Sequence, residues 1–432
     1  MSPSTATPDP PAIDDLLGYL DASPTPYHAA AEAARRRAEA GSVAVALDAS
    51  WADPPPVGHL LADGALIAWA LPAGGPAAPR LRLVGAHTDS PGLRVKPRPD
   101  TGTCGWRQLG VEVYGGALVN SWLDRDLGLA GRVAVAGATG VQTRLVRIDE
   151  PWLRVAQLAI HLDRELSSQG LKLDRQRHLT PIWGVGVPDV GGFRRHLAER
   201  LDVAPDAIGG WDLMVHDLSS AAVVGVGGAL VSSGRLDDLV SCWAGLVALE
   251  AAAEPGAVGA VLALFDHEEV GSASTRGAGG ELLTGVLERL VVGRGGSRSD
   301  LLRAVAGSAL ASVDMAHATH PNYPERHEPG HPVTIDGGPV VKVNANQRYA
   351  TEPATQAAFE LACAAAGVPV QHFVGHNEVP CGSTIGPVTA AGLGVPTVDV
   401  GVAQLAMHSA RELCGSEDPV RMTAALAAWF AG

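Results

Sequence analysis

A set of histidines and carboxylic acids stands at the ends of apolar segments along the chain. The set comprises His87, Asp89, Asp237, Glu268, Glu269, Asp314 and His408. These side chains offer hard oxygen and borderline nitrogen donors without sulfur, a combination that suits zinc or manganese in an open catalytic site. A single His or Asp is usually a structural group, but several of them at strand ends in one chain favour a metal centre.

The adjacent pair Glu268-Glu269 carries the sharpest chemical signal in this set. Neighbouring residues that leave a strand diverge, so one glutamate can bind metal while the other handles water. A bound metal lowers the pKa of water to about 7, and a nearby carboxylate can accept that proton and return it to a leaving amine. Taken alone, the pair is more simply interpreted as two solvated glutamates. The other clusters shift the interpretation toward hydrolysis.

Alternating helix and strand patterns would bring this set to one edge of a sheet. Residues 13–40 have the spacing of two helices, and another helix is predicted at 239–252. The predicted strands are 65–72, 80–89, 259–269, 309–320 and 395–402. This alternation predicts the α/β class, with a mixed, largely parallel sheet flanked by helices. In such sheets ligands bind beyond the carboxyl ends of the strands, which is where the set stands.

The middle of the chain has a different texture, with short alternating segments such as VEVYGGALV, RVAVAG and QTRLVRI. This texture predicts a β-rich domain inserted into the α/β domain. A chain of 432 residues also exceeds the size at which one core keeps growing. The predicted catalytic domain is 1–96 plus 231–432, and the predicted insert is 97–230, with the Pro-rich stretch 95–102 as the crossover.

Composition and absent motifs exclude several classes of function. A net charge of −14 repels polyanions, so no nucleic-acid partner is expected. No apolar run is long enough to span a bilayer and no secretory signal is recognisable, so we predict no membrane partner and a cytoplasmic location. Five cysteines without a CxxC pair argue against a disulfide framework or a thiolate zinc site. The sequence offers no GxSxG elbow, no GxxxxGK phosphate loop and no HExxH helix.

Long blocks over nearly the whole chain are recognisable in their order. They include DASPTPYHA (21–29), GAHTDSPGLRVKP (85–97), GRLDDLVSC (234–242), FDHEEVGS (265–272), SVDMAHATHPNYPERHE (312–328), GPVVKVNANQRYAT (338–351), PCGSTIGP (380–387) and QLAMHSARE (404–412). In these blocks the sequence resembles the aspartyl aminopeptidase family, relatives of the vacuolar aminopeptidase. The resemblance implies an aminopeptidase that removes Asp and Glu from peptide N-termini.

The resemblance also implies a metal site with two Zn²⁺ ions per subunit. Asp237 would bridge the two ions, one carboxylate oxygen on each. His87 and Asp314 would complete the first ion, and Glu269 and His408 would complete the second. The same ligands accept Mn²⁺ or Co²⁺, so the sequence does not fix the native metal.

Further roles follow from the resemblance rather than from spacing. Asp89 would orient the His87 imidazole, and Glu268 would be the general base. Lys342 would select acidic substrate side chains by charge. His317 and His320 would form hydrogen bonds around the site or at a subunit contact. A histidine equivalent to His161 would reach a neighbouring subunit's active site from the inserted domain. The implied assembly is a homo-oligomer, a tetrahedral dodecamer that encloses its active sites and admits short peptides.

Two departures from the family pattern and two rival functions remain open. Asp238 stands where the family commonly has asparagine, and would alter metal affinity or cap the following helix. The stretch 217–225 also diverges. A neutral-residue aminopeptidase or a dipeptidase would use the same metals, and aminoacyl chromogenic substrates would distinguish them. A catalytically silent assembly protein is the rival from another class, and the complete ligand set with Glu268 argues against it.

Overall fold

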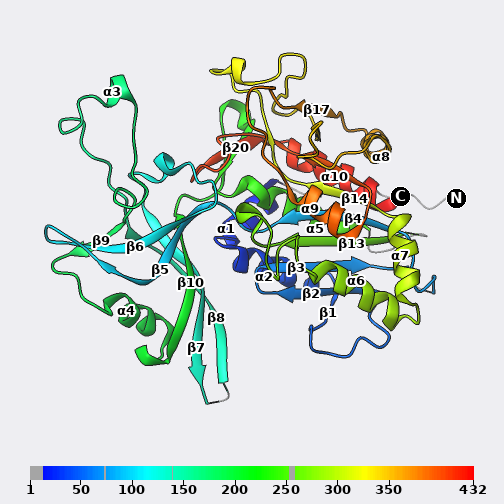
Figure 1. Ribbon diagram of the computed structural model, residues 1–432, viewed down its shortest axis with the longest axis horizontal. Helices are drawn as coiled ribbons and strands as arrows, with labels where there is room; N and C mark the ends of the chain where they lie inside the picture. Colours follow the sequence, from blue (N-terminus) through cyan, green and yellow to red (C-terminus); the bar gives the residue numbers. More distant parts are fainter. Residues whose placement is uncertain (1–12, 73, 139, 253–257) are drawn as a thin grey trace.

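Apolar segments from both ends of the chain form one nine-stranded sheet. The computed structural model describes residues 13–72, 74–138, 140–252 and 258–432 (Figure 1). The strands of this sheet are β1 (Val43–Ala44), β2 (Val57–Ala62), β3 (Ala65–Ala70), β4 (Leu81–His87), β13 (Gly259–Phe265), β14 (Ala309–Val313), β16 (Val340–Val343), β17 (Gln371–Val374) and β18 (Thr397–Gly401). Their order is β1-β2-β3-β13-β4-β14-β18-β16-β17.

The four adjacent strands β13, β4, β14 and β18 run parallel to one another. Five of the eight pairings in the sheet are parallel, so the predicted mixed, largely parallel α/β sheet is confirmed. All five predicted strands are shorter in the structure. The largest differences are in β13, which ends at Phe265, and β14, which ends at Val313, before the charged residues that follow. The carboxyl ends of parallel strands meet at one edge, so these charged residues lie together.

Helices cover both faces of the nine-stranded sheet (Figure 1). One apolar core joins the sheet to α1 (Ile13–Ala22), α2 (Pro26–Glu39), α5 (Leu236–Ala251), α8 (Pro353–Ala365) and α10 (Asp418–Ala431). A second core joins the opposite face to α6 (Leu282–Gly293), α7 (Arg298–Ala306) and α9 (Ile385–Leu393). Alternate residues of β13 enter one core and then the other, as the two-residue period of a strand requires.

The middle of the chain builds a separate six-stranded antiparallel sheet (Figure 1). Its order is β8-β7-β10-β5-β6-β9. The elements are β5 (Gly92–Thr101), β6 (Trp106–Tyr114), β7 (Leu127–Gly137), β8 (Gly140–Leu153), α3 (Leu166–Gln169), β9 (Ile182–Val185), α4 (Gly192–Leu201) and β10 (Ile208–Asp217). The Pro-rich stretch 95–102 lies in β5 rather than forming a crossover. Its prolines fall where the pairing of β5 with β6 is irregular, because proline cannot donate to a ladder.

A third, five-stranded sheet lies beside the edge where the charged residues gather. Its strands are β11 (Ala222–Val224), β12 (Leu230–Ser233), β20 (Glu412–Gly415), β19 (Ala403–Leu405) and β15 (Ala316–His317). β11 and the first residue of β12 fall in the predicted insert, yet β12 pairs with β20 near the C-terminus. The exact division into two domains therefore stays a prediction. Among the described residues, no helix combines the length and apolar character of a membrane crossing.

Candidate metal centre

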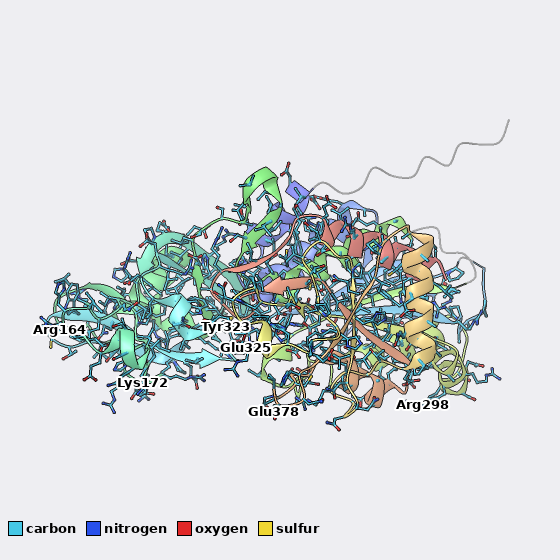
Figure 2. The ribbon with its side chains drawn as sticks, turned by 90° about the horizontal axis from the view of Figure 1, so that it is seen from above. Arg164, Lys172, Arg298, Tyr323, Glu325 and Glu378 are labelled. Atoms are coloured by element: carbon cyan, nitrogen blue, oxygen red, sulfur yellow. The ribbon has the colours of Figure 1, made fainter. Side chains whose placement is uncertain are left out.

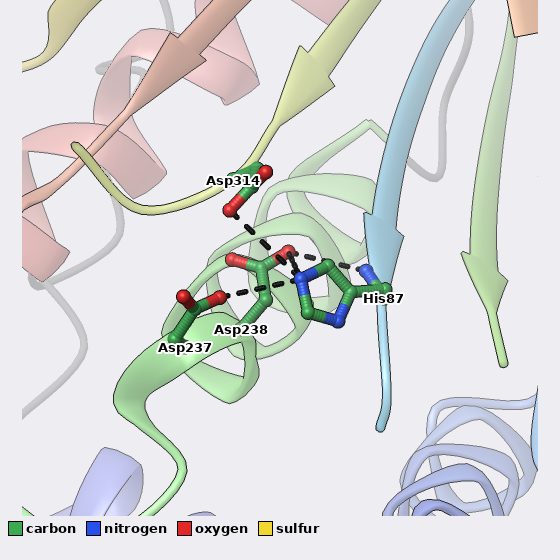
Figure 3. Close-up of side chains that lie close together, drawn as sticks. All are labelled: His87, Asp237, Asp238 and Asp314. Carbon is green, nitrogen blue, oxygen red and sulfur yellow. Dashed lines mark hydrogen bonds and ion pairs between the residues drawn. The ribbon is translucent and has the colours of Figure 1, made fainter. Parts of the chain in front are cut away.

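The five proposed ligands come from separate elements that end at the same place. His87 is the last residue of β4, and Asp314 follows β14 directly. Glu269 lies in a short 3₁₀ turn (Glu268–Val270) after β13. Asp237 stands in the first turn of α5, and His408 in the loop between β19 and β20. Figure 3 shows three of them, together with Asp238, pointing toward one another.

The two carboxylate oxygens of Asp237 face different partners. Its Oδ1 lies 3.2 Å from Nε2 of His87, and that nitrogen is 3.8 Å from Oδ1 of Asp314. Its Oδ2 lies 3.5 Å from Nε2 of His408, and that nitrogen is 3.4 Å from Oε1 of Glu269. The side chains therefore divide into two donor groups that share Asp237.

Several oxygens in this cluster lack a hydrogen-bond partner within the described part of the chain. They are Oδ1 of Asp237, Oδ1 of Asp238 and Oε1 of Glu269. Burying a carboxylate oxygen without a partner is costly, so native proteins rarely leave one unpaired. The donor atoms of each group lie within 4.8 Å of one another. A divalent cation fits this arrangement, because it would pair with the orphaned oxygens and offset the concentrated negative charge.

Both histidines are oriented so that Nε2 faces the cluster. Nδ1 of His87 lies 3.0 Å from the main-chain oxygen of Asp89 and 3.4 Å from its Oδ1. Nδ1 of His408 lies 3.2 Å from the main-chain oxygen of Gly116. These acceptors favour the tautomer with the proton on Nδ1, which leaves a lone pair on Nε2 for a metal. The predicted orienting contact of Asp89 with His87 is thus present.

Asp89 also organises the glutamate pair. Its Oδ1 accepts the main-chain N–H of Glu268 at 3.0 Å, and its Oδ2 accepts that of Glu269 at 3.1 Å. The hydroxyl of Tyr114, at the end of β6 in the six-stranded sheet, donates to Oδ2 at 2.7 Å. Burial opposes ionisation of Asp89, but His87 and these donors together lower its pKa. The six-stranded sheet therefore supports a residue of the metal centre.

The electrostatics differ between neighbouring carboxyl groups. Burial raises the pKa of Glu268 to about 7, and the charges of Asp314 and Asp237 add to this effect. Burial also acts on Asp237, but its close contacts with His408 and His87 lower its pKa below the ordinary value. A bound cation acts in the same direction on all of these groups by favouring their ionised forms.

A cleft of about 410 Å³ opens over the cluster. It is lined by all five proposed ligands together with Glu268, Lys342, His317, Tyr349, Met407 and residues 382–384. Lys342 is only 2% exposed, and its Nζ donates to the main-chain oxygens of Asp314 and Met315 at 2.9 and 3.2 Å. His317 is exposed at the cleft. Lys342 is the one Lys or Arg among the described lining residues.

His161 lies outside this cleft. It is exposed in the irregular segment before α3, and Figure 2 labels the nearby Arg164 at the end of the view formed by the middle of the chain. The stretch HEPGH (327–331) matches the HExxH pattern of zinc-binding helices. It contains Pro and Gly, however, and forms no helix. Asp238 does not cap α5 through its side chain, and instead its Oδ2 accepts the N–H of His87 at 3.1 Å.

Two supporting residues escaped the sequence reasoning. Tyr114 donates to Asp89, and the carboxylate of Glu412 accepts the N–H groups of Asp237 and His408. Burial, followed by the charge of Asp237, raises the pKa of Glu412 to about 8. Glu412 is the last residue of the block QLAMHSARE, which contributes to the family resemblance, so the sequence could have drawn attention to it. The sequence does not show which residues it contacts.

Comparison with known proteins identifies the family of this chain. A family model described as "Aminopeptidase I zinc metalloprotease (M18)" matches residues 19–430. The chain belongs to the M18 family. A "Probable M18 family aminopeptidase 2" of Streptomyces coelicolor is 53% identical over 422 residues, which cover 96% of this chain and 97% of the relative.

Solved structures of M18 proteins have the same fold. The chain resembles one from the cryo-EM structure of the Ape4 and Nbr1 complex, with a TM-score of 0.93, 34% identity, and coverage of 97% of this chain and 85% of the other. It also resembles the S. cerevisiae mApe1 dodecamer, with a TM-score of 0.84, 26% identity, and coverage of 97% and 96%. The predicted family, fold class and broad activity, a zinc-dependent aminopeptidase, are confirmed.

Proposed function

We propose that this M18 protein binds two zinc ions, with Asp237 as the bridge between them. The observation that carries the proposal is the division of Asp237 between two partner sets, Oδ1 toward His87 and Oδ2 toward His408. Asp314 would complete the first set and Glu269 the second. Mn²⁺ or Co²⁺ would fit the same donors, since none of them is sulfur.

Glu268 is the proposed general base. Bound zinc supplies a more acidic water and a polarised scissile carbonyl. The carboxyl group of Glu268 lines the cleft, and Asp89 holds its main chain. From this position Glu268 takes the proton from the attacking water and delivers it to the departing amine. Carboxylates in the cleft walls also attract the cationic N-terminus of a peptide, which fits removal of single residues from that end.

Lys342 is the proposed determinant of a preference for N-terminal Asp or Glu. Its ammonium group is buried in the cleft wall, where a substrate carboxylate would meet no other Lys or Arg among the described lining residues. A substrate with a neutral N-terminal side chain would offer the Lys342 ammonium group no carboxylate to pair with. His317, also in the cleft lining, is the proposed hydrogen-bonding neighbour of the substrate.

We propose further that the working enzyme is a homo-oligomer, a tetrahedral dodecamer as the family resemblance implies. His161 and the apolar side chains around it are exposed away from their own cleft, which fits a role at a neighbouring subunit. The expected substrates are peptides with acidic N-termini. The predicted cytoplasmic location and the inserted domain at 97–230 are kept as parts of this proposal.

The test combines metal analysis with Glu268→Gln. The wild-type protein and this variant should each carry two zinc ions per subunit by mass spectrometry. Turnover of Asp and Glu chromogenic substrates should fall by roughly 10²- to 10⁴-fold in the variant, because only proton transfer is removed. Glu281→Gln, at an exposed position, is the matched control. Full activity of Glu268→Gln would remove the base assignment, and faster cleavage of Leu than of Asp or Glu by the wild type would remove the acidic preference.

A further inference from the structure

Glu412 is a buried carboxylate next to the metal centre, and it belongs to neither donor group of the two-zinc proposal. Its side chain is among the buried polar groups, at 2% exposure. Both of its oxygens are already occupied by main-chain donors. Oε2 accepts the N–H of Asp237 at 3.0 Å, and Oε1 accepts the N–H of His408 at 2.7 Å.

The two donors lie far apart in sequence, and Glu412 links their main chains by accepting both N–H groups. Asp237 begins α5, directly after β12, while His408 lies in the loop that leads into β20. Strand β12 pairs with β20, with Ser233 opposite Glu412, and this register places Glu412 between them. The loop needs such support, because Ala406 and His408 both have the left-handed φ values of 57° and 67°. The hydrogen bond from His408 fixes the second of these conformations.

We propose that Glu412 is a positioning residue that holds the bridging Asp237 and the His408 loop in a common register. The inference rests on the two-zinc function proposed above and adds a residue to its machinery. Glu412 acts through main-chain atoms and touches no substrate. In that proposal His408 and Glu269 bind the same ion. Loss of Glu412 therefore lowers the affinity for that ion more than the affinity for the ion bound by His87 and Asp314.

The carboxylate chemistry of Glu412 makes this role specific. Two oxygens accept from two different N–H groups, so both ends must be acceptors. Glutamine offers one acceptor and one donor, and its NH₂ would face the N–H of either Asp237 or His408. One of the two segments must then move away. Removing an outer partner of a metal ligand typically costs roughly 10- to 100-fold in metal affinity or activity.

Asp418 provides a matched control for Glu412. It is fully buried at the start of α10, and it also accepts two main-chain N–H groups, from Asp336 at 2.7 Å and Gly338 at 2.8 Å. Neither donor is in the proposed metal centre. Asp418→Asn therefore reproduces the general cost of replacing such a carboxylate without disturbing a ligand.

The experiment measures zinc retention in the full-length protein against a graded chelator, for the wild type, Glu412→Gln and Asp418→Asn. We expect Glu412→Gln to lose one ion at roughly 10- to 100-fold lower chelator concentration, with kcat reduced more than KM. Co²⁺ loaded into that weakened site should give an altered visible absorption spectrum. Asp418→Asn should keep both ions and the wild-type spectrum, while the melting temperatures of both metal-free variants fall.

Wild-type zinc affinity, spectrum and kcat in Glu412→Gln would overturn the proposal and leave only a structural role. Glu412→Asp is the second variant, because it keeps both acceptors but withdraws them from the two donors. This variant should show a smaller loss of zinc affinity and kcat than Glu412→Gln. Wild-type zinc affinity and kcat in a folded Glu412→Asp would equally overturn the proposal. A wild-type protein with fewer than two zinc ions would instead contradict the proposed function, so the two failures are distinguishable.

Discussion

The metal cluster and the segment around His161 are opposite kinds of exception to ordinary burial. In the cluster, buried carboxylate oxygens of Asp237 and Glu269 have no hydrogen-bond partner among the described residues. In the segment, Leu158, Ile160 and Leu162 are 57%, 52% and 75% exposed. Buried polar atoms and contiguous exposed apolar side chains are both informative, since folding of one subunit explains neither.

The two regions differ in the kind of interaction partner that would satisfy them. Unpaired buried oxygens call for a cation, and clustered exposed apolar side chains call for another protein surface. All five proposed metal ligands of the cluster come from one chain. His161, in contrast, is not among the residues that line the cleft of its own chain. The two regions should therefore respond differently to mutation.

The largest expected effect is the loss of both metals on replacement of Asp237. Asp237→Asn removes the charge that both donor groups share, so activity should fall by more than the roughly 100-fold typical of an outer partner. Bound zinc should fall below one ion per subunit by mass spectrometry. Asp418→Asn is the control, since that buried carboxylate accepts main-chain N–H groups outside the cluster. Equal losses in the two variants would contradict the bridging role.

The next largest effect should come from a charge placed in the exposed apolar segment. Leu162→Asp should break the assembly into smaller species, seen by light scattering, because a charge at an apolar contact loses its hydration. Activity should fall together with the size of the assembly, because His161 no longer reaches the active site of a neighbouring subunit. The zinc content should stay unchanged. Leu302→Asp, at another exposed leucine on α7, is the comparison variant. Dissociated subunits with full activity would show that His161 is not needed.

Patterns in the sequence were sufficient for the part of the site that lies at strand ends. His87, Glu269 and Asp314 each follow a run of apolar residues, and such runs end where a parallel strand leaves the core. The periodicity also predicted the helices that pack on both faces of the sheet. These features depend on local patterns, which are visible in a single chain.

Contacts between residues far apart in sequence could not be predicted from local sequence patterns. His408 lies in a loop with left-handed residues, and its assignment needed the family resemblance. Tyr114 and Glu412 act through bonds to residues far away in sequence, which no local period records. The exact bounds of the insert stay a prediction for a related reason, since texture does not tell which sheet strands such as β11 and β12 join. The prolines of β5 ended the pattern without ending the strand.

A smaller effect should appear in substrate choice when Lys342 is replaced. In Lys342→Met, kcat/KM for Asp and Glu substrates should fall by roughly 10- to 100-fold relative to Leu, as one lost charge contact would give. Because Lys342 also donates to the main-chain oxygen of Asp314, a positioning role alone would lower all substrates equally. The ratio of Asp to Leu turnover separates these roles, and an unchanged ratio would contradict selection by charge.

The smallest expected effect concerns the seam where α2 contacts the six-stranded sheet, a region away from both the metal cluster and the His161 segment. His28 on α2 and His216 on β10 lie there, both near Arg147 and Asp149, and burial lowers the pKa of each to about 4. In the unfolded chain a histidine titrates near 6.5. Between pH 6.5 and 4 the unfolded state therefore binds more protons, and stability falls as the pH falls through that window.

Replacing one of these histidines should flatten that dependence. Each contributes a slope of up to about 1.4 kcal/mol per pH unit, so metal-free His216→Gln should lose unfolding free energy less steeply than the metal-free wild type. Urea unfolding at pH 7, 6 and 5 measures the difference, and exposed His196→Gln should keep the wild-type slope. If the slopes of all three proteins agree, His216 is protonated in the native state. The seam would then need a counter-charge, and Asp149, whose Oδ1 is 3.7 Å from Nε2 of His216, is the group positioned to provide it.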